Sequence, residues 1–121
     1  MERYYPIFLD LEGKPVIVIG GGRVACEKVA GLRRAGAAIT VVSPELAPEL
    51  RELEQAGALT HVPRPWQESD LDGDWALIMV ATDDGAVNRR VSLAGRARRI
   101  WVNAADDPAN CDFILPAVVR R

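Results

Sequence analysis

Continuously apolar runs alternate along this chain with segments in which apolar residues recur at helical spacing. Apolar runs such as residues 15–20 predict strands buried on both faces, as the strands of a parallel sheet are. Residues 23–35, where Ala25, Val29 and Leu32 repeat every three to four positions, predict a helix with one buried stripe. The predicted strands are 15–20, 38–42, 59–62, 75–81 and 100–104, and the predicted helices are 23–35, 48–56 and 85–98.

This alternation of strands and helices predicts the fold class. Strands separated by helical segments form βαβ units, which build a parallel sheet with helices on both faces. We therefore expect an α/β protein with a Rossmann-like, doubly wound parallel sheet in a three-layer αβα arrangement. A chain of 121 residues has the size of one domain, so residues 1–121 are predicted to form a single domain.

Two apolar segments lie outside the alternating pattern, one at each end of the chain. The side chains of the first segment are expected to pack as a lead-in over the sheet. They are Tyr5, Ile7, Phe8, Leu9 and Leu11. Residues 111–121 are apolar as well, and they predict an element at the edge of the sheet or the start of a further segment.

Three glycines follow the first predicted strand. Gly20, Gly22 and Ala25 have the G-x-G-x-x-A spacing of dinucleotide-binding turns. Gly20 permits the tight turn, Gly22 leaves room for a diphosphate, and Ala25 keeps the helix close to the sheet. The helix then directs free N–H groups and the positive end of its dipole at the phosphates. The predicted contacts are Gly20, Gly21, Gly22, Arg23 and Val24; the alternative is a tight turn that binds nothing.

The acidic residue that usually selects NAD is missing. NAD sites usually have Asp or Glu at the end of the second strand, where it binds the ribose hydroxyls, and this chain has Ser43 followed by Pro44. Both are predicted cofactor contacts. Ser43 could bind a ribose more weakly or cap a turn, and no arginine adjoins it to favour a 2′-phosphate. The residues alone therefore leave the choice between NAD and NADP open.

Polar residues also follow the fourth and fifth strands. Thr82 and Asp83 follow the fourth, and Asp106 and Asp107 follow the fifth. Parallel sheets bind ligands beyond the carboxyl ends of their strands, so Thr82 and Asp83 are predicted cofactor contacts. The alternative is that Asp83 or Asp84 caps the next helix.

Composition narrows the function further. A net charge of −2 argues against a general nucleic-acid binder. Cys26 and Cys111 make no disulfide scaffold, so a reducing, cytoplasmic setting is expected. The sequence has neither a signal peptide nor a run of 18 apolar residues, so no membrane partner is predicted. His61, the one histidine, is expected to be solvated rather than catalytic, and no metal site is predicted.

Four groups of residues together resemble the precorrin-2 dehydrogenase module of siroheme synthases. They are residues 5–11 with 18–22, 81–84 with 87–88, 102–108, and 113–117. The similarity covers essentially the whole chain. It implies an oxidoreductase of siroheme and porphyrin biosynthesis that converts precorrin-2, a small-molecule tetrapyrrole, to sirohydrochlorin with NAD as cofactor. Some members of the family also insert iron.

The resemblance also implies a catalytic residue. In that family an aspartate after the fifth strand is a proposed general base, and Asp106 matches its position. Dehydrogenation delivers a hydride to the nicotinamide while a proton leaves the macrocycle, so a carboxylate near the ring is needed. The alternative is that Asp106 and Asp107 only shape a turn before Pro108.

The family continues beyond this chain into a dimerisation segment and a helical domain that help form the substrate cleft. Residues 113–121 are interpreted as the start of that segment, and a homodimer is expected. The chain would then be the NAD-binding module of the enzyme. The alternative function is a non-catalytic, regulatory nucleotide-binding Rossmann domain of the potassium-transport type. Ser43 and the stretches 105–108 and 113–117 argue against it.

Overall fold

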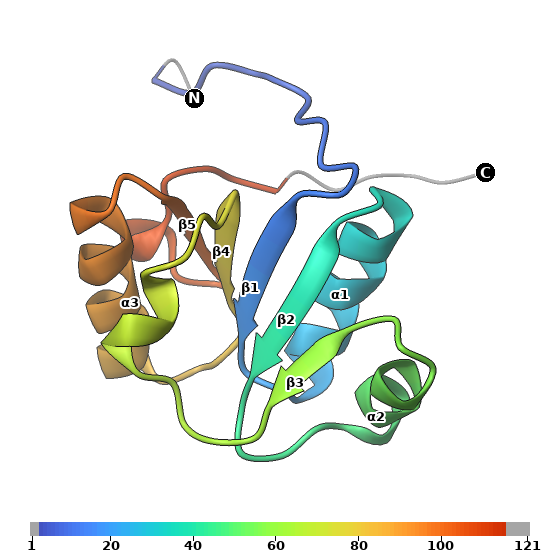
Figure 1. The fold of residues 1–121 in the computed structure, drawn as a ribbon. Coiled ribbons are helices and arrows are strands. Elements are labelled where there is room, and N and C mark those ends of the chain that lie inside the picture. The colour runs from blue at the N-terminus through green and yellow to red at the C-terminus, as the bar shows by residue number, and fades with distance from the viewer. Residues whose placement is uncertain (1–2, 116–121) are drawn as a thin grey trace.

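The computed structural model describes residues 3–115 and has the predicted α/β architecture. Five parallel strands form one sheet in the order β3-β2-β1-β4-β5, so the direction of winding reverses between β1 and β4. Helices cover both faces of the sheet, which gives three layers (Figure 1). The elements are β1 Pro15–Ile19, α1 Arg23–Arg34, β2 Ala38–Val42, α2 Pro48–Gln55, β3 Thr60–Val62, η1 Glu68–Leu71, β4 Leu77–Val80, α3 Gly85–Ala97, β5 Trp101–Ala104 and η2 Pro108–Asn110.

The buried side chains form two clusters, one on each face of the sheet. Val16 and Val18 of β1 join the cluster under α1 and α2. Ile17 and Ile19 join the cluster under η1 and α3. This explains why the sequence of β1 is apolar at successive positions, since both of its faces are covered.

The register of the sheet brings the carboxyl ends of its central strands together. Ile19 at the end of β1 pairs with Val42 of β2 and with Val80 of β4. The residues that follow these strands therefore meet at one edge: the Gly20 amide donates to Val42 O at 3.0 Å, and the Ala81 amide to Ile19 O at 2.7 Å. Ligand sites of open α/β sheets lie at this edge.

Element boundaries agree with the prediction to within two residues. The largest difference is at β4, where Trp75 and Ala76 precede the strand. The segment 68–74, which lies between the predicted strands 59–62 and 75–81, contains the short helix η1.

The expectation that the N-terminal segment packs over the sheet was wrong. The side chains of Tyr5, Ile7 and Phe8 are exposed, Phe8 fully, and only Leu11 packs against the core. Both faces of the sheet are already covered by helices. The turn at Gly13, whose φ is 72°, leads into β1 from a segment that runs away from the sheet (Figure 1).

Residues 111–113 cover the outer edge of β5, as predicted, without forming a strand. The Asp112 amide donates to Val102 O at 2.7 Å, and Asp112 Oδ2 accepts from the Val102 amide at 2.9 Å. The sulfur of Cys111 contacts the backbone of Ala104. Because side chains occupy these ladder positions, no regular strand pairs here. Residues 116–121 lie outside the described part of the chain.

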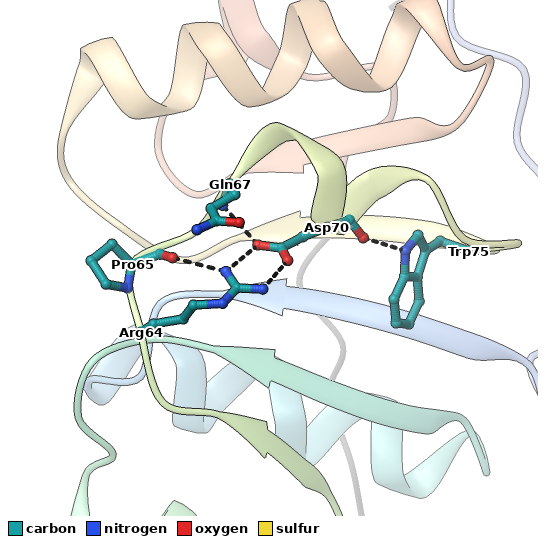
Figure 2. A network of polar contacts seen from close by, with 5 residues as sticks. All are labelled: Arg64, Pro65, Gln67, Asp70 and Trp75. Atoms are coloured by element: carbon teal, nitrogen blue, oxygen red, sulfur yellow. Dashed lines mark hydrogen bonds and ion pairs between the residues drawn. The ribbon is translucent and has the colours of Figure 1, made fainter.

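An ion pair organises the crossover between β3 and β4 (Figure 2). The Arg64 guanidinium binds both carboxylate oxygens of Asp70, at 3.0 and 2.5 Å, and donates to Pro65 O. Asp70 Oδ2 also accepts from the Gln67 amide at 2.7 Å, and Asp70 O accepts from Trp75 Nε1 at 2.8 Å. Bidentate pairing of this kind fixes the relative orientation of the two groups. It holds the loop around Pro65 at the carboxyl edge of the sheet.

We predict that this pair makes stability depend on acid pH. Hydrogen bonding from Arg64 lowers the pKa of the Asp70 carboxyl. A lowered native pKa contributes stability above the unfolded value of about 3.9, and this contribution is lost as pH falls through the native pKa. Asp70→Asn should lower the thermal unfolding midpoint by a few degrees at pH 7. The difference from wild type should shrink below about pH 4; a difference that is constant down to pH 2 would contradict the assignment.

Candidate dinucleotide-binding site

The three glycines after β1 have different surroundings. Gly20 has a φ of 117°, and a Cβ there would lie 2.6 Å from Ala81 O. A Cβ on Gly21 would overlap Glu45 O and the Ser43 hydroxyl. A Cβ on Gly22 would meet nothing within 4 Å. The first two glycines are therefore required by packing, whereas Gly22 faces open space, as a position approached by a diphosphate must.

The N-terminus of α1 has no acceptor of its own. Gly22 is the N-cap, no side chain caps the helix, and its first turn has no acidic residue. Ala25, fully buried, lets the helix lie close to the sheet. By contrast, Asp84 accepts from the amides of Ala86 and Val87 at the start of α3. Of these two helices, α1 is the one with free N–H groups for an anion.

A cleft of about 550 Å³ opens at this edge of the sheet. The predicted contacts that line it are Gly20, Gly21, Gly22, Ser43, Pro44 and Thr82. Arg23, Val24 and Asp83 are exposed and do not line it. The cleft lies where the strand order reverses, and its volume suits a cofactor-sized ligand.

The lining of the cleft has almost no charged residues. Among the residues that the structure describes, no lysine or arginine lines it, and Glu45 is its one charged residue. A 2′-phosphate would find no cationic partner in this lining, and the negative charge of Glu45 disfavours a second negative group nearby. The ribose of NAD carries no such phosphate, so this lining favours NAD over NADP.

Ser43 is buried and already makes hydrogen bonds within the protein. Its hydroxyl donates to Glu45 O at 2.7 Å, and its carbonyl lies 2.8 Å from His61 Nε2. A carbonyl only accepts, so Nε2 carries the proton. With its own proton in use, the Ser43 hydroxyl could act toward a ribose only as an acceptor.

The expectation that His61 is solvated was wrong, because its side chain is only 10% exposed. Nδ1 lies 3.7 Å from Glu54 on α2. His61 pairs with Val41, which lies two residues before Ser43. The side chains of His61, Val41 and Ser43 therefore lie on the same face of the sheet. The burial of His61 could have been predicted from the sequence only if the register of the short strand β3 had been known.

The polar residues after β4 and β5 have separate roles. Asp84, not Asp83, caps α3. Asp107 is half-buried and accepts from the side chains of Asn88 and Asn110, at 3.2 and 2.8 Å. Asp106 is exposed, with no hydrogen-bond partner among residues 3–115, and it lies beyond the lining of the cleft.

The sequence did not reveal several residues that line the cleft. Among them, Pro65 and Trp66 come from the loop after β3. Trp66 packs against the core, and the Arg90 guanidinium lies 5.4 Å from the centroid of its ring. Their place depends on the pair between Arg64 and Asp70, which no local pattern predicts.

Neither a metal cluster nor a membrane-spanning helix occurs in the described part of the chain. No three His, Cys, Asp or Glu side chains there are grouped to hold a metal ion. None of its helices combines the length and apolarity needed to cross a bilayer.

The glycine turn, the uncapped helix and the cleft at the reversal of strand order define a Rossmann-type dinucleotide-binding domain. The chain belongs to the family described as "Putative NAD(P)-binding", whose model matches residues 7–117. This membership confirms the predicted fold and the predicted class of cofactor.

Similar proteins come from siroheme biosynthesis. The chain is 47% identical to siroheme synthase 1 of Cronobacter sakazakii over 98% of its length, and 46% identical to siroheme synthase of Methylobacillus flagellatus over 96%. It spans about a quarter of the length of each, 25% in both cases. Among solved structures, SirC, a precorrin-2 dehydrogenase, matches with a TM-score of 0.82 and 36% identity, over 98% of this chain and 57% of that one. These likenesses confirm the resemblance seen in the sequence.

Substitutions at Gly20 and Gly22 should separate folding from cofactor binding. In Gly22→Ala the new methyl group meets no protein atom, so unfolding free energy should fall by less than about 1 kcal/mol. The methyl group would occupy the approach of the diphosphate, and NAD affinity measured by calorimetry should fall at least about tenfold.

Gly20→Ala is the matched control. Overlap with Ala81 O and the positive φ should cost about 2–4 kcal/mol of unfolding free energy. Unchanged NAD affinity in a folded Gly22→Ala variant would show that the diphosphate binds elsewhere.

Proposed function

We propose that this chain binds NAD and carries out the dehydrogenation of precorrin-2 to sirohydrochlorin. The observation that carries the proposal is the open glycine turn at an uncapped helix, in a chain that is 36% identical to a precorrin-2 dehydrogenase. The chain spans 25% of the siroheme synthase and 57% of SirC, so the activity for which they are named is a proposal for this protein.

The residues of the turn would hold the cofactor. The free amides at the start of α1 suit a diphosphate, and Gly22 leaves its approach open. The lining of the cleft supports NAD rather than NADP, since Glu45 would repel a 2′-phosphate. When bound, NAD⁺ supplies the acceptor for the hydride that leaves the substrate.

We assign the base to Asp106. Loss of a hydride from precorrin-2 must be matched by loss of a proton, which a carboxylate can accept. The carboxylate of Asp106 is exposed and has no hydrogen-bond partner among residues 3–115, which supports this role, whereas that of Asp107 is occupied by two amide donors.

Asp106→Ala should abolish turnover without weakening cofactor binding. Removal of a general base typically costs about 10²- to 10⁴-fold in rate. The change is measured as formation of sirohydrochlorin from precorrin-2 and NAD⁺. Turnover by Asp106→Ala at the wild-type rate would refute the assignment of the base.

Calorimetric titration of the same variant with NAD is the control, and its affinity should remain within about twofold of wild type. Wild-type protein titrated with NAD, NADP and ATP should bind NAD most tightly. A regulatory nucleotide-binding domain would instead bind a nucleotide and leave precorrin-2 unchanged, an outcome that would favour this second function.

We infer further that residues 1–121 act as one NAD-binding domain and that two copies assemble. The exposed side chains of Tyr5, Ile7 and Phe8 provide an apolar surface for such an assembly. Sedimentation equilibrium should give the mass of a dimer, and Phe8→Ser should shift it toward the monomer. The free thiols of Cys26 and Cys111 fit a reducing, cytoplasmic setting.

A further inference from the structure

Asn88 is a buried polar residue between the ends of two strands. It lies in the first turns of α3 and is 2% exposed. Its Oδ1 accepts from the Thr82 hydroxyl at 3.1 Å, at the end of β4, and its Nδ2 donates to Asp107 Oδ2 at 3.2 Å, after β5. One side chain thus links a residue of the cofactor cleft to the loop that carries the proposed base.

The directions of these bonds are fixed by chemistry. A carboxylate only accepts, so the amide nitrogen of Asn88 must face Asp107 and its oxygen must face Thr82. The Thr82 hydroxyl donates to Asn88 and accepts from the Asp84 amide at 3.2 Å. An aspartate or leucine of similar size at position 88 could not make both contacts.

The loop that Asn88 contacts has an unusual backbone. Asp106 has a φ of 55°, in the left-handed region that residues other than glycine adopt infrequently, aspartate and asparagine more often than most. Such conformations persist only where the surrounding contacts impose them. Those contacts are on Asp107, whose carboxylate is held by Asn88 and Asn110 and whose amide donates to Ala104 O at 3.2 Å.

We propose that Asn88 is a positioning residue, which acts through Asp107 to hold the Asp106 carboxylate in register with a cofactor bound beside Thr82. Asn88 itself does not line the cleft. With Asp107 turned inward against Asn88, the left-handed Asp106 presents its carboxylate to solvent at the carboxyl edge of the sheet. The catalytic part of this inference rests on the proposed dehydrogenase function.

The first test compares Asn88→Ala with Val91→Ala, a control truncated at a fully buried position of the same helix. Misplacement of a reacting group by about 1 Å can cost about 10²-fold in rate. We expect kcat for precorrin-2 oxidation to fall about 10²-fold in Asn88→Ala, with NAD affinity within about threefold of wild type. A kcat equal to that of Val91→Ala would overturn the proposal.

Variants of Asp107 test the same link if Asn88→Ala fails to fold. Asp107→Ala should reproduce the loss of kcat, and Asp107→Asn, which keeps an oxygen acceptor for Asn88, should recover most of it. The double variant Asn88→Ala with Asp107→Ala should be no slower than either single variant, because both break one link. Losses that multiply would show that the two residues act independently.

Hydrogen exchange provides a readout that needs no turnover. The amides of Asp107, Asn110 and Cys111 are hydrogen-bonded within the loop. In Asn88→Ala these amides should exchange at least about tenfold faster than in wild type. In Val91→Ala their exchange rates, compared with those of the sheet amides, should stay as in wild type. If wild type binds NAD but does not oxidise precorrin-2, the proposed function is wrong. The hydrogen-exchange rates alone then test whether Asn88 positions the loop. Unchanged exchange in Asn88→Ala would then overturn the positioning role.

Discussion

The close approach of β1 to β4 at Gly20 is the constraint on which the site depends. With Ala81 O 2.6 Å from the place of a Cβ, only glycine lets the chain leave β1 at a φ of 117°. That exit starts α1 directly beside the ends of β2 and β4, with its first amides free. A bulkier residue would displace the start of the helix, and the cleft would lose the group that can bind a diphosphate.

The two long helices show how one motif serves binding and stability in the same sheet. Both α1 and α3 begin at the carboxyl edge, where a helix dipole favours negative charge. Asp84 supplies that charge to α3 from within the chain, so α3 is complete without a ligand. Gly22 supplies none to α1. Of these two helices, α1 is therefore the one whose N-terminus is free to bind an anion.

Sequence predicted the sheet well and the surface poorly, for a physical reason. The runs in β1 and β4 are apolar because both faces are buried, which local composition reports directly. The apolar side chains of Tyr5 and Phe8 were predicted to pack by the same logic, but hydrophobicity does not reveal whether a surface remains to be covered. The pair between Arg64 and Asp70 depends on the path of a crossover, which no periodicity encodes.

Within the site, Asp106 and Asp107 show most clearly what could not be predicted from the sequence. As neighbouring carboxylates before a proline they are equivalent in the sequence, and only backbone geometry separates them. A left-handed residue reverses the course of the chain, so adjacent side chains can face opposite ways: Asp107 turns in to Asn88 and Asn110, and Asp106 stays exposed. The contacts of Asp107 hold the backbone in this infrequent conformation. The exposed carboxylate of Asp106 therefore lies next to a half-buried aspartate whose amide donors, Asn88 and Asn110, hold the loop that carries both residues.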